Sequence, residues 1–378
     1  MSLLTRDQAD LRDVVRNFAR QKIAPRAAEY DRSGEFPWDN INEMAKLDLF
    51  GLPIPEEYGG AGLDTVSYML AIEEISKCCA ATGAIMAVHT SAGIMPIQLF
   101  GTEEQKKKYI PDVATGKKIA AFALTEPGAG SDASQVATTA TLDGDEYVLN
   151  GTKCFITNGV AASTYCVFAT VDKSKGVKGI TGFIVEKGTP GFTFGKKEDK
   201  MGIRASATSE LIFQDCRIPK DNLLGKIGEG FKIAMVVLDG ARIGIGAQAV
   251  GIAQAAYEEA LNYSKVRVQF GKPIAALQTI RNMLADMAIQ IEAARQLVYH
   301  AAELKDAGLP YGNEAAMAKT FASDVAVDVA LNAIQIMGGY GYSREYPVER
   351  LLRDAKITQI YEGTNQIQRV VIAGHILK

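Results

Sequence analysis

The sequence has few of the residues that metal and disulfide chemistry require. Its 378 residues include only three histidines (His89, His300 and His375) and five cysteines. No two cysteines have Cys-x-x-Cys spacing, and the adjacent Cys78 and Cys79 suit neither a mutual disulfide nor a zinc site. The histidines form no His-x-x-x-His pair. We therefore expect packed or surface histidines, no metal site and no Cys–His nucleophilic pair.

The sequence also shows no large excess of one charge sign and no long apolar run that stands out. The chain carries 41 Lys and Arg against 44 Asp and Glu, a net charge of −3, whereas a nucleic-acid binder usually shows a basic excess. The polar start, MSLLTRD, predicts no signal peptide. We also expect no uncharged stretch near 18 residues that could span a bilayer, because the apolar patches, such as 233–238, are too short. These absences predict a cytoplasmic protein without a membrane span.

Three regions of different texture fill the chain. Residues 1–118 show apolar residues at helical spacing, and residues 119–226 show short β-type runs separated by turn signals such as Asp143-Gly144-Asp145. Residues 227–378 are helical again, with longer helices rich in glycine and alanine. The order predicts a multi-domain α+β protein with an N-terminal all-α domain, a middle antiparallel β-barrel-like domain or sandwich, and a C-terminal helix bundle.

Two segments of the middle region combine turns with hydroxyl and aromatic residues. In 122–131, FALTEPGAGS, glycine would expose backbone N–H groups, and Thr125 and Ser131 would add hydroxyls. Such a loop suits a polar ring edge or a phosphate. In 152–157, TKCFIT, Phe155 offers a face to a planar cofactor. From these residues alone, a wide turn and an ordinary hairpin strand remain the simpler interpretations.

Glycines also cluster in 335–342, QIMGGYGY. This segment follows a predicted helix over 313–337 and not a strand, so it is not a dinucleotide-binding fingerprint. Gly338 is instead the predicted C-cap of that helix. A glycine cap also exposes backbone to a ligand, so both roles are compatible.

The segment 361–369, YEGTNQIQR, places one carboxylate just before the last predicted helix. Asn365 is its predicted N-cap, because Gln368 follows at capping-box spacing. Glu362 is then either a first-turn acid that complements the helix dipole or a reactive carboxylate. The spacing alone favours the first interpretation.

Taken in order, four motifs carry a resemblance to a known family. Across residues 5–376 the sequence resembles the acyl-CoA dehydrogenase flavoproteins, in particular their short-chain, butyryl-CoA dehydrogenase-like branch. This resemblance implies an N-terminal helical domain, a middle β-barrel-like domain and a C-terminal four-helix bundle, usually in a homotetramer. The motifs are LTEPGAGSD (124–132), RVQFGKPIAALQ (267–278), QIMGGYGY (335–342) and YEGTNQIQR (361–369).

The resemblance implies an FAD site between the β domain and the bundle. Arg267, Gln278 and the segment 335–339, which includes Gln335, Gly338 and Gly339, would reach FAD from a neighbouring subunit, and Phe270 is a further cofactor residue of the same motif. The remaining implied cofactor residues are Phe122, Leu124, Thr125, Gly130, Ser131, Phe155, Ile156, Thr157, Thr364, Asn365 and Gln366.

By the same resemblance, Glu362 is the base that removes the α-proton of an acyl-CoA while FAD takes the β-hydride. The electrons would pass to electron-transferring flavoprotein. Ser131, Asp239 and Arg242 would contact the CoA ligand, and Gly363 would let the chain approach the acyl group. An ordinary glutamate, with a pKa near ~4.3, is a poor base here. We expect burial, which raises this pKa, to outweigh the nearby helix N-terminus, which lowers it.

Substrate and direction stay open at this point. Some members carry the base on the CoA-contacting helix, but Ala241 stands there, so Glu362 has no rival. Where glutaryl-CoA dehydrogenases place an arginine, this chain has Gly83, which disfavours a dicarboxylic substrate. We expect a short acyl group, although a branched, cyclic or aryl-propanoyl group would suit the same chemistry. The resemblance is also compatible with an enoyl-CoA reductase, an oxidase or a non-catalytic flavin- or acyl-CoA-binding homologue.

Overall fold

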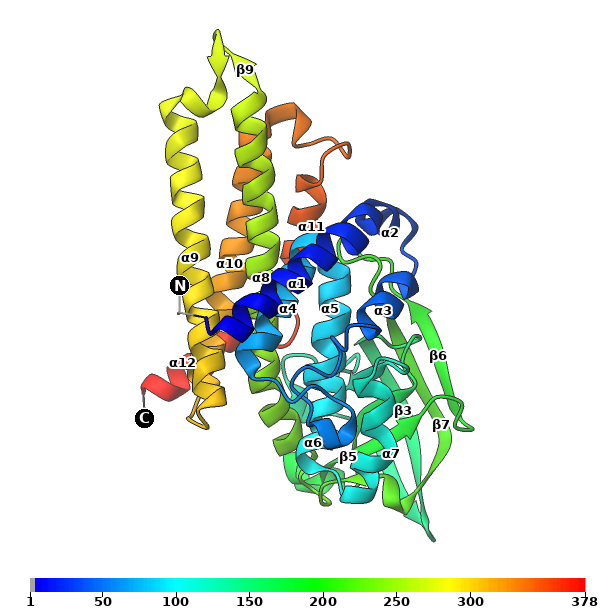
Figure 1. Cartoon of the computed structure of the whole chain (residues 1–378). Helices are drawn as coiled ribbons and strands as arrows, with labels where there is room; N and C mark the ends of the chain where they lie inside the picture. Colours follow the sequence, from blue (N-terminus) through cyan, green and yellow to red (C-terminus); the bar gives the residue numbers. More distant parts are fainter. Residues whose placement is uncertain (1–3, 378) are drawn as a thin grey trace.

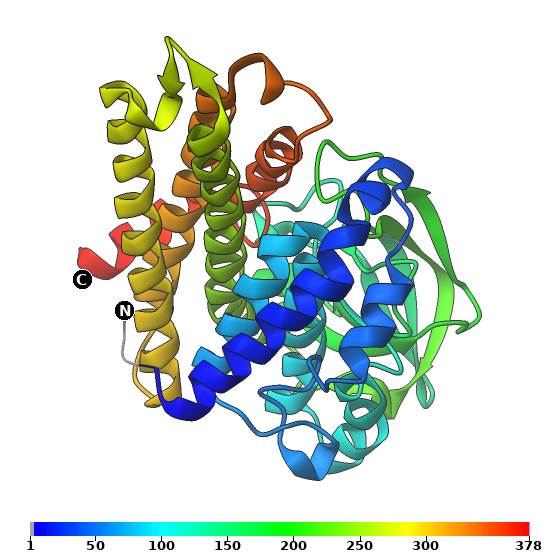
Figure 2. The same cartoon turned by 45° about the horizontal axis from the view of Figure 1, so that its top comes forward.

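The computed structural model describes residues 4–377, and its N-terminal helices lie between a helix bundle and a β-sheet (Figure 1). A view turned by 45° shows the same arrangement (Figure 2). Two short π-helical segments, Ala19–Ile23 and Val88–Ile94, interrupt this region. Its α-helices are α1 (Arg6–Phe18), α2 (Ala27–Ser33), α3 (Trp38–Ala45), α4 (Thr65–Cys78), α5 (Ala80–Ala87), α6 (Met95–Phe100) and α7 (Glu103–Ala114).

The middle region forms an eight-stranded sheet in the order β6-β7-β3-β2-β4-β5-β8, with β1 paired to β4. Most neighbours are antiparallel, as predicted, but β1 and β2 both run parallel to β4, so the sheet is mixed. The predicted turn at Gly144 joins β2 to β3 with a positive φ of 63°. The strands are β1 (Ala120–Ala123), β2 (Thr139–Asp143), β3 (Glu146–Thr157), β4 (Thr164–Thr170), β5 (Ile180–Glu186), β6 (Phe192–Lys197), β7 (Thr208–Pro219) and β8 (Leu223–Leu224).

The C-terminal region is the predicted bundle, and α8 is its longest helix with 37 residues. The hairpin of β9 (Val268–Gln269) and β10 (Lys272–Pro273) joins α8 to α9 and projects from one end of the bundle (Figure 1). The bundle helices are α8 (Gly230–Val266), α9 (Gln278–Asp306), α10 (Gly312–Met337), α11 (Val348–Thr358) and α12 (Asn365–Ile376).

Small residues let α8 approach its neighbours closely, as the sequence predicted. A Cβ atom on Gly251 would lie 2.4 Å from the carbonyl oxygen of Glu73 on α4. One on Gly246 would lie 2.8 Å from Cγ2 of Val298 on α9. Since real Cβ atoms do not approach other atoms this closely, any larger residue at either site would push the helices apart.

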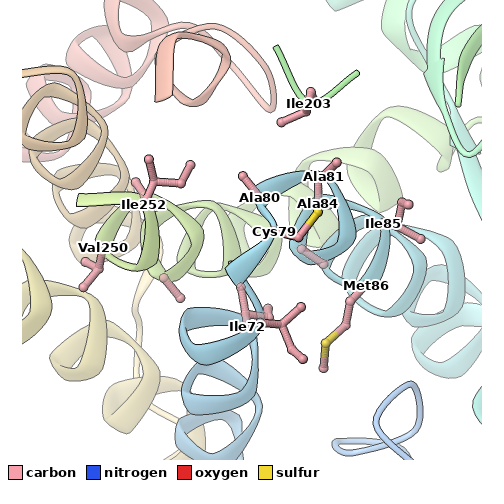
Figure 3. Packing of buried hydrophobic residues seen from close by; sticks show 14 of the residues in the cluster. Ile72, Cys79, Ala80, Ala81, Ala84, Ile85, Met86, Ile203, Val250 and Ile252 are labelled. Atoms are coloured by element: carbon pink, nitrogen blue, oxygen red, sulfur yellow. The ribbon is translucent and has the colours of Figure 1, made fainter. Parts of the chain in front are cut away.

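The extended backbone of Cys79, with φ −153° and ψ 104°, separates α4 from α5. Around this break, Ile72 on α4, Ala84 on α5, Ile252 on α8 and Ile203 from the β6–β7 loop belong to one cluster of buried hydrophobic residues (Figure 3). All four are at most 3% exposed. The bundle, the N-terminal helices and the β region therefore share one hydrophobic core.

A buried histidine links the N-terminal helices to the sheet. His89 Nδ1 accepts the backbone N–H of Ala120 on β1, and Nε2 lies 2.9 Å from the carbonyl oxygen of Val113 on α7. Because Nδ1 accepts, Nε2 carries the proton and donates. Burial lowers the pKa of His89 to about 4, so the ring is neutral at pH 7. His89 is thus a packed histidine, as predicted.

The predicted domain boundaries fall in connecting segments. α7 ends at Ala114 and β1 begins at Ala120, on either side of the boundary between 118 and 119. β8 ends at Leu224 and α8 begins at Gly230, on either side of the boundary between 226 and 227. The division into 1–118, 119–226 and 227–378 stays a prediction, because the regions share a core.

Within residues 4–377, three helical stretches are long and apolar enough to cross a membrane by length and composition. This finding corrects the expectation from the sequence, which overlooked that residues 78–102 contain no Asp, Glu, Lys or Arg. The stretches are Ala80–Phe100, Gly230–Val266 and Gly312–Tyr340, and their most apolar windows are 78%, 72% and 50% buried within the protein. Much of this apolar surface therefore contacts other parts of the chain.

The contact between α8 and the sheet predicts a specific sensitivity. A Cβ on Gly230 would lie 2.6 Å from a backbone atom of Thr181 on β5, and backbone cannot move aside as a side chain does. Gly230→Ala should lower the free energy of unfolding by about 1–3 kcal/mol. Chemical denaturation followed by circular dichroism measures it.

Gly374→Ala on α12 is the matched control, because a Cβ there meets nothing within 4 Å. Alanine favours a helix over glycine, so this variant should be as stable as the wild type or slightly more stable. Equal destabilisation by the two substitutions would contradict the close contact of α8 with β5.

Candidate active site

Glu362 lies in the short connection between α11 and α12, in an uncommon backbone conformation. Its φ is +51°, and the next residue, Gly363, has φ +91°. A residue other than glycine rarely adopts positive φ, and it does so where surrounding contacts fix it. The connection from Gln359 to Thr364 is called the Glu362 loop below.

Two buried side chains hold the carbonyl groups of the Glu362 loop. Lys319 Nζ on α10 donates to the Gly363 carbonyl oxygen at 2.8 Å. Gln368 Nε2 on α12 donates to the same oxygen at 2.9 Å and to the Glu362 carbonyl oxygen at 3.2 Å. Both side chains are fully buried. These bonds fix the backbone from which the Glu362 side chain projects.

The N-cap of α12 is Thr364, so the prediction of Asn365 was wrong by one residue. Thr364 Oγ1 accepts the backbone N–H of Ile367 at 3.3 Å. The Asn365 side chain is 3% exposed and turns toward α10, where Nδ2 donates to Asp324 at 2.8 Å. Gln368 binds the loop carbonyls and forms no capping box. The tertiary contact with α10 determines the direction of the Asn365 side chain, and local spacing could not reveal it.

Glu362 is partly buried, and one oxygen of its carboxylate is shielded from solvent. Within residues 4–377, its Oε2 atom is buried without a hydrogen-bond partner. Burial raises the pKa of Glu362 to about 7, although the positive charges of Lys319 and Arg242 act in the opposite direction. The upward direction is the one expected from burial, while the balance against the helix N-terminus with substrate bound stays a prediction. A carboxylate with this pKa takes up and releases a proton near neutral pH.

Arg242 and Asp239, predicted to contact CoA, form an ion pair on α8. Arg242 Nη1 donates to Asp239 Oδ1 at 2.5 Å. Arg242 is 5% exposed, and its Nε is buried without a partner among the described residues. The guanidinium lies close enough to Glu362 to lower its pKa. This unsatisfied donor fits a site that a polar ligand completes.

The two predicted cofactor segments of the β region lie side by side. The backbone N–H of Cys154 donates to the Thr125 carbonyl oxygen at 3.0 Å. Lys153 Nζ donates to the Leu124 carbonyl oxygen at 3.1 Å and pairs with Glu126 at 2.6 Å. The loop after β1 and the end of β3 therefore form one surface, as the cofactor hypothesis requires.

The Lys153–Glu126 pair was missed from the sequence. Lys153 is 0% exposed, and Glu126, at 6%, also accepts the backbone N–H groups of Ala137 and Thr138. Desolvation lowers the pKa of Lys153 to about 8 despite its partner. A lysine within the predicted strand 152–157 could have indicated a buried charge. The sequence could not identify its acceptor, Glu126, which lies 27 residues away.

Side chains of the predicted cofactor residues divide into buried and exposed sets. Phe122 packs on Phe168, with ring centroids 4.9 Å apart, and Leu124 and Ile156 are 6% and 2% exposed. The side chains of Leu124 and Ile156 belong to the core, so those two residues offer a ligand mainly their backbone atoms, whereas Phe122 is only partly buried. Phe155 is instead 64% exposed at a bulge of β3, with φ +55°.

Glycines on the same surface fit an approaching ligand. A Cβ on Gly128 or Gly130 would meet nothing within 4 Å, and neither residue has positive φ. The same holds for Gly339, which lies elsewhere, after the C-terminal end of α10. Neither packing nor backbone conformation thus requires glycine at these positions. An exposed loop without Cβ atoms leaves room for a flat or phosphate-bearing group against its backbone.

A second group of predicted cofactor residues lies at the hairpin end of the bundle (Figure 1). The Arg267 guanidinium lies 5.4 Å from the Tyr340 ring centroid, and Phe270, at the hairpin turn, is 88% exposed. Gly338 caps α10 with φ +59°, as predicted. Gln278 begins α9, and Gln335 and Gly339 are exposed at the C-terminal end of α10. The structure thus separates these residues from the surface around Phe155.

Comparisons with known proteins agree with this architecture: the chain belongs to the acyl-CoA dehydrogenase family. Sequence models of that family's N-terminal, middle and C-terminal domains match residues 5–117, 121–216 and 228–377. Members of this family are FAD-dependent oxidoreductases, and the chain is therefore such an enzyme. Within residues 4–377, no group of three or more His, Cys, Asp or Glu side chains is placed to hold a metal ion.

Among curated relatives, an acyl-CoA dehydrogenase of Bacillus subtilis is 59% identical over 99% of both chains. A short-chain specific acyl-CoA dehydrogenase of Clostridium acetobutylicum is 53% identical over 99% of both. An acryloyl-CoA reductase (NADH) of Anaerotignum propionicum is also 53% identical, over 99% of this chain and 95% of its own.

Solved structures extend the comparison. Butyryl-CoA dehydrogenase from Megasphaera elsdenii has a TM-score of 0.98 and 53% identity over 99% of both chains. A chain from a structural study of the electron-transferring flavoprotein of Acidaminococcus fermentans has a TM-score of 0.99 and 56% identity over 100% of both. An acyl-CoA dehydrogenase from Bacillus anthracis, solved in complex with FAD, has a TM-score of 0.93 and 38% identity over 99% of this chain and 67% of its own.

Phe155 gives a test of the cofactor surface. Because its side chain is 64% exposed, Phe155→Ala should leave the stability of FAD-free protein unchanged. It should weaken FAD binding about ten- to a hundred-fold, because burying a phenylalanine contributes about 1.5–3 kcal/mol. The dissociation constant is measured from FAD fluorescence during titration.

Leu142→Ala on β2 is the control, because Leu142 is also exposed, at 49%, on the same sheet. Its FAD affinity should match that of the wild type. An unchanged affinity in Phe155→Ala, or an equal loss in both variants, would remove Phe155 from the cofactor site.

Proposed function

We propose that this enzyme converts a short-chain acyl-CoA thioester to the trans-2-enoyl-CoA, with Glu362 as the base, and passes the electrons to electron-transferring flavoprotein. The observation that carries the proposal is the solvent-shielded carboxylate oxygen of Glu362, on a loop fixed by hydrogen bonds. The short-chain dehydrogenase and butyryl-CoA dehydrogenase relatives support the substrate class. The flavoprotein study that contains a closely similar chain supports the electron acceptor.

In the proposed reaction the bond between the α-carbon and its hydrogen breaks, and the proton passes to a Glu362 carboxylate oxygen. A glutamate with an ordinary pKa would return this proton too readily, whereas burial has raised the pKa of Glu362 to about 7. Gly363 is also proposed to lie beside the acyl group, although the loop itself already requires glycine there: its φ is +91°, and a Cβ would lie 2.5 Å from Gln368 Nε2. FAD, when bound, supplies the acceptor for the β-hydride, which protein side chains lack.

The residues proposed to bind FAD and CoA are those that the family motifs identified. Backbone atoms of 122–131 and the exposed Phe155 would hold FAD, and Thr364 and Gln366 border the same loop as Glu362. Ser131, Asp239 and Arg242 would bind the CoA part. The exposed hairpin residues around Phe270 would reach FAD of a neighbouring subunit in a homotetramer, because they lie away from this chain's own cofactor surface. We also propose a cytoplasmic location, which the bacterial dehydrogenase relatives support.

The structure argues against a dicarboxylic substrate. Gly83 stands where an arginine would meet a distal carboxylate, and its hypothetical Cβ would lie 2.0 Å from Ser76 Oγ. A side chain at this position would displace the Ser76 hydroxyl and lie 3.1 Å from Ser76 Cα, so a residue as large as arginine would crowd α4. The buried surroundings are apolar, with Ala84 and Ile85 at 0% exposure. An apolar acyl chain suits them better than a carboxylate does.

The reverse reaction, reduction of an enoyl-CoA, is the second candidate. It is favoured by the 53% identity to an acryloyl-CoA reductase. The same carboxylate serves both directions, because a group with a pKa of about 7 is present in its protonated and ionised forms at neutral pH. Protonated Glu362 would then deliver a proton to the α-carbon.

Anaerobic titration with a panel of CoA esters tests the proposed function. Saturated acyl-CoAs of about four carbons should bleach the flavin absorbance fastest, and glutaryl-CoA should not bleach it. For the second candidate, the chemically reduced protein is mixed with a four-carbon trans-2-enoyl-CoA, and rapid return of colour supports reduction. A protein without flavin, or one that no acyl-CoA bleaches, would contradict the proposal.

Glu362→Gln tests the base. The amide has nearly the same shape but cannot take the proton, so FAD should stay bound while the bleaching rate falls about 10²–10⁴-fold. The wild-type rate should rise with pH through a midpoint near 7, because only ionised Glu362 accepts a proton. Stopped-flow absorbance measures both. A near wild-type rate in the variant would assign the base elsewhere.

A further inference from the structure

One face of α10 holds the Glu362 loop at both of its ends. Before Glu362, Gln359 Nε2 donates to Asp324 Oδ1 at 2.7 Å. After it, Asn365 Nδ2 donates to the same oxygen at 2.8 Å. Lys319, five residues before Asp324 on α10, binds the middle of the loop through the Gly363 carbonyl oxygen. The helix thus fixes the start, middle and end of the segment that presents the carboxylate.

Lys319 is the unusual member of this set, because it is 0% exposed and no carboxylate among the described residues accepts a hydrogen bond from its ammonium group. Its Nζ donates to the Gly363 carbonyl oxygen at 2.8 Å and to Asn365 Oδ1 at 2.9 Å, and both acceptors are neutral. Burying an ammonium group in this way is costly unless its charge is compensated nearby. Glu362, one residue before Gly363, is a carboxylate near enough to compensate it.

We propose that Lys319 is a positioning residue for Glu362: its hydrogen bond to the Gly363 carbonyl fixes the direction of the carboxylate, and its charge favours the ionised, proton-accepting form. The proposal rests on the proposed function, in which Glu362 is the base. It assigns to Lys319 no contact with the substrate.

The other charged and titratable groups near Lys319 and Glu362 do not fill the role proposed for Lys319. Arg242 on α8 also favours ionised Glu362, but it is already paired with Asp239. Tyr68 on α4 and the adjacent Tyr361 are neutral, because burial raises the pKa of both phenols further above 10. Lys319 itself faces Glu362 and Asp324, which raise its pKa, and Arg242, which lowers it.

Together these effects bring the pKa values of Lys319 and Glu362 close to each other. Burial lowers the pKa of Lys319 to about 7, and burial raises the pKa of Glu362 to about 7. Each group therefore senses the charge of the other in the pH range where the enzyme is expected to work. Removal of the lysine charge makes Glu362 harder to ionise, so the pKa of Glu362 must rise.

Lys319→Met tests this proposal through the pH profile of anaerobic flavin bleaching by a four-carbon acyl-CoA. The maximal rate should fall about ten- to a hundred-fold, because the carboxylate is no longer held in line. The midpoint of the profile should move up by about one pH unit, because a positive charge is lost. FAD content and the acyl-CoA concentration for half-maximal rate should stay unchanged. Lys319→Arg, which keeps the charge, should restore the midpoint.

Lys200→Met is the matched control. Lys200 is a partly buried lysine on the β6–β7 loop, and its Nζ likewise donates to a backbone carbonyl, that of Ser206, at 2.7 Å. Its profile and rate should equal those of the wild type. If Lys319→Met loses FAD or does not fold, Lys319→Gln replaces it, because glutamine is neutral but still donates hydrogen bonds.

A wild-type midpoint in the neutral variant would overturn the proposal, even with a reduced rate, because a merely structural role lowers the rate without moving the midpoint. The same shift in Lys200→Met would also overturn it. Failure of the proposed function is visible separately and first: wild-type protein that no acyl-CoA bleaches would remove both proposals before any variant is made.

Discussion

The close approach of α8 to its neighbours is the contact on which the arrangement of the three regions depends. Glycines along this one helix meet β5, α4 and α9 at distances that leave no room for a Cβ atom. The same helix carries Arg242, which faces Glu362, and so the spacing of the helices also sets the surroundings of the carboxylate. Backbone packing and site electrostatics are therefore two results of one sequence feature.

The site illustrates how burial and charge combine. Desolvation alone would make Glu362 a weak acid that holds its proton at neutral pH, and the opposite charges of Lys319 and Arg242 limit this effect. The Glu362 carboxylate is therefore shielded from water and can still ionise near neutral pH. Gln368, Thr364 and Asn365, all from the start of α12, serve the geometry of the loop and carry no charge.

Much of the fold was predictable from the sequence, because helical and strand periodicity are local signals. The four motifs likewise direct attention to the Glu362 loop, whose catalytic role stays a proposal. The Gly338 cap and the small residues of α8 belong to this predictable part. Contacts between distant segments were not predictable: Asn365 turns to Asp324 on another helix, and Lys153 meets Glu126 across 27 residues. The uncharged run 78–102 was overlooked because small and polar residues such as glycine, serine and threonine interrupt its apolar residues.

The buried Lys153–Glu126 pair has a consequence for how this sequence can change. Loss of either partner alone leaves an uncompensated charge inside the protein, at a cost of about 3–5 kcal/mol, whereas joint replacement by apolar residues of similar volume can be nearly neutral. Glu126 also holds the N–H groups of Ala137 and Thr138, so such a replacement must supply those donors with a new acceptor. A single substitution at Lys153 or Glu126 is therefore expected to be strongly destabilising. Both residues must change together, and residues 137–138 must find another acceptor for their N–H groups.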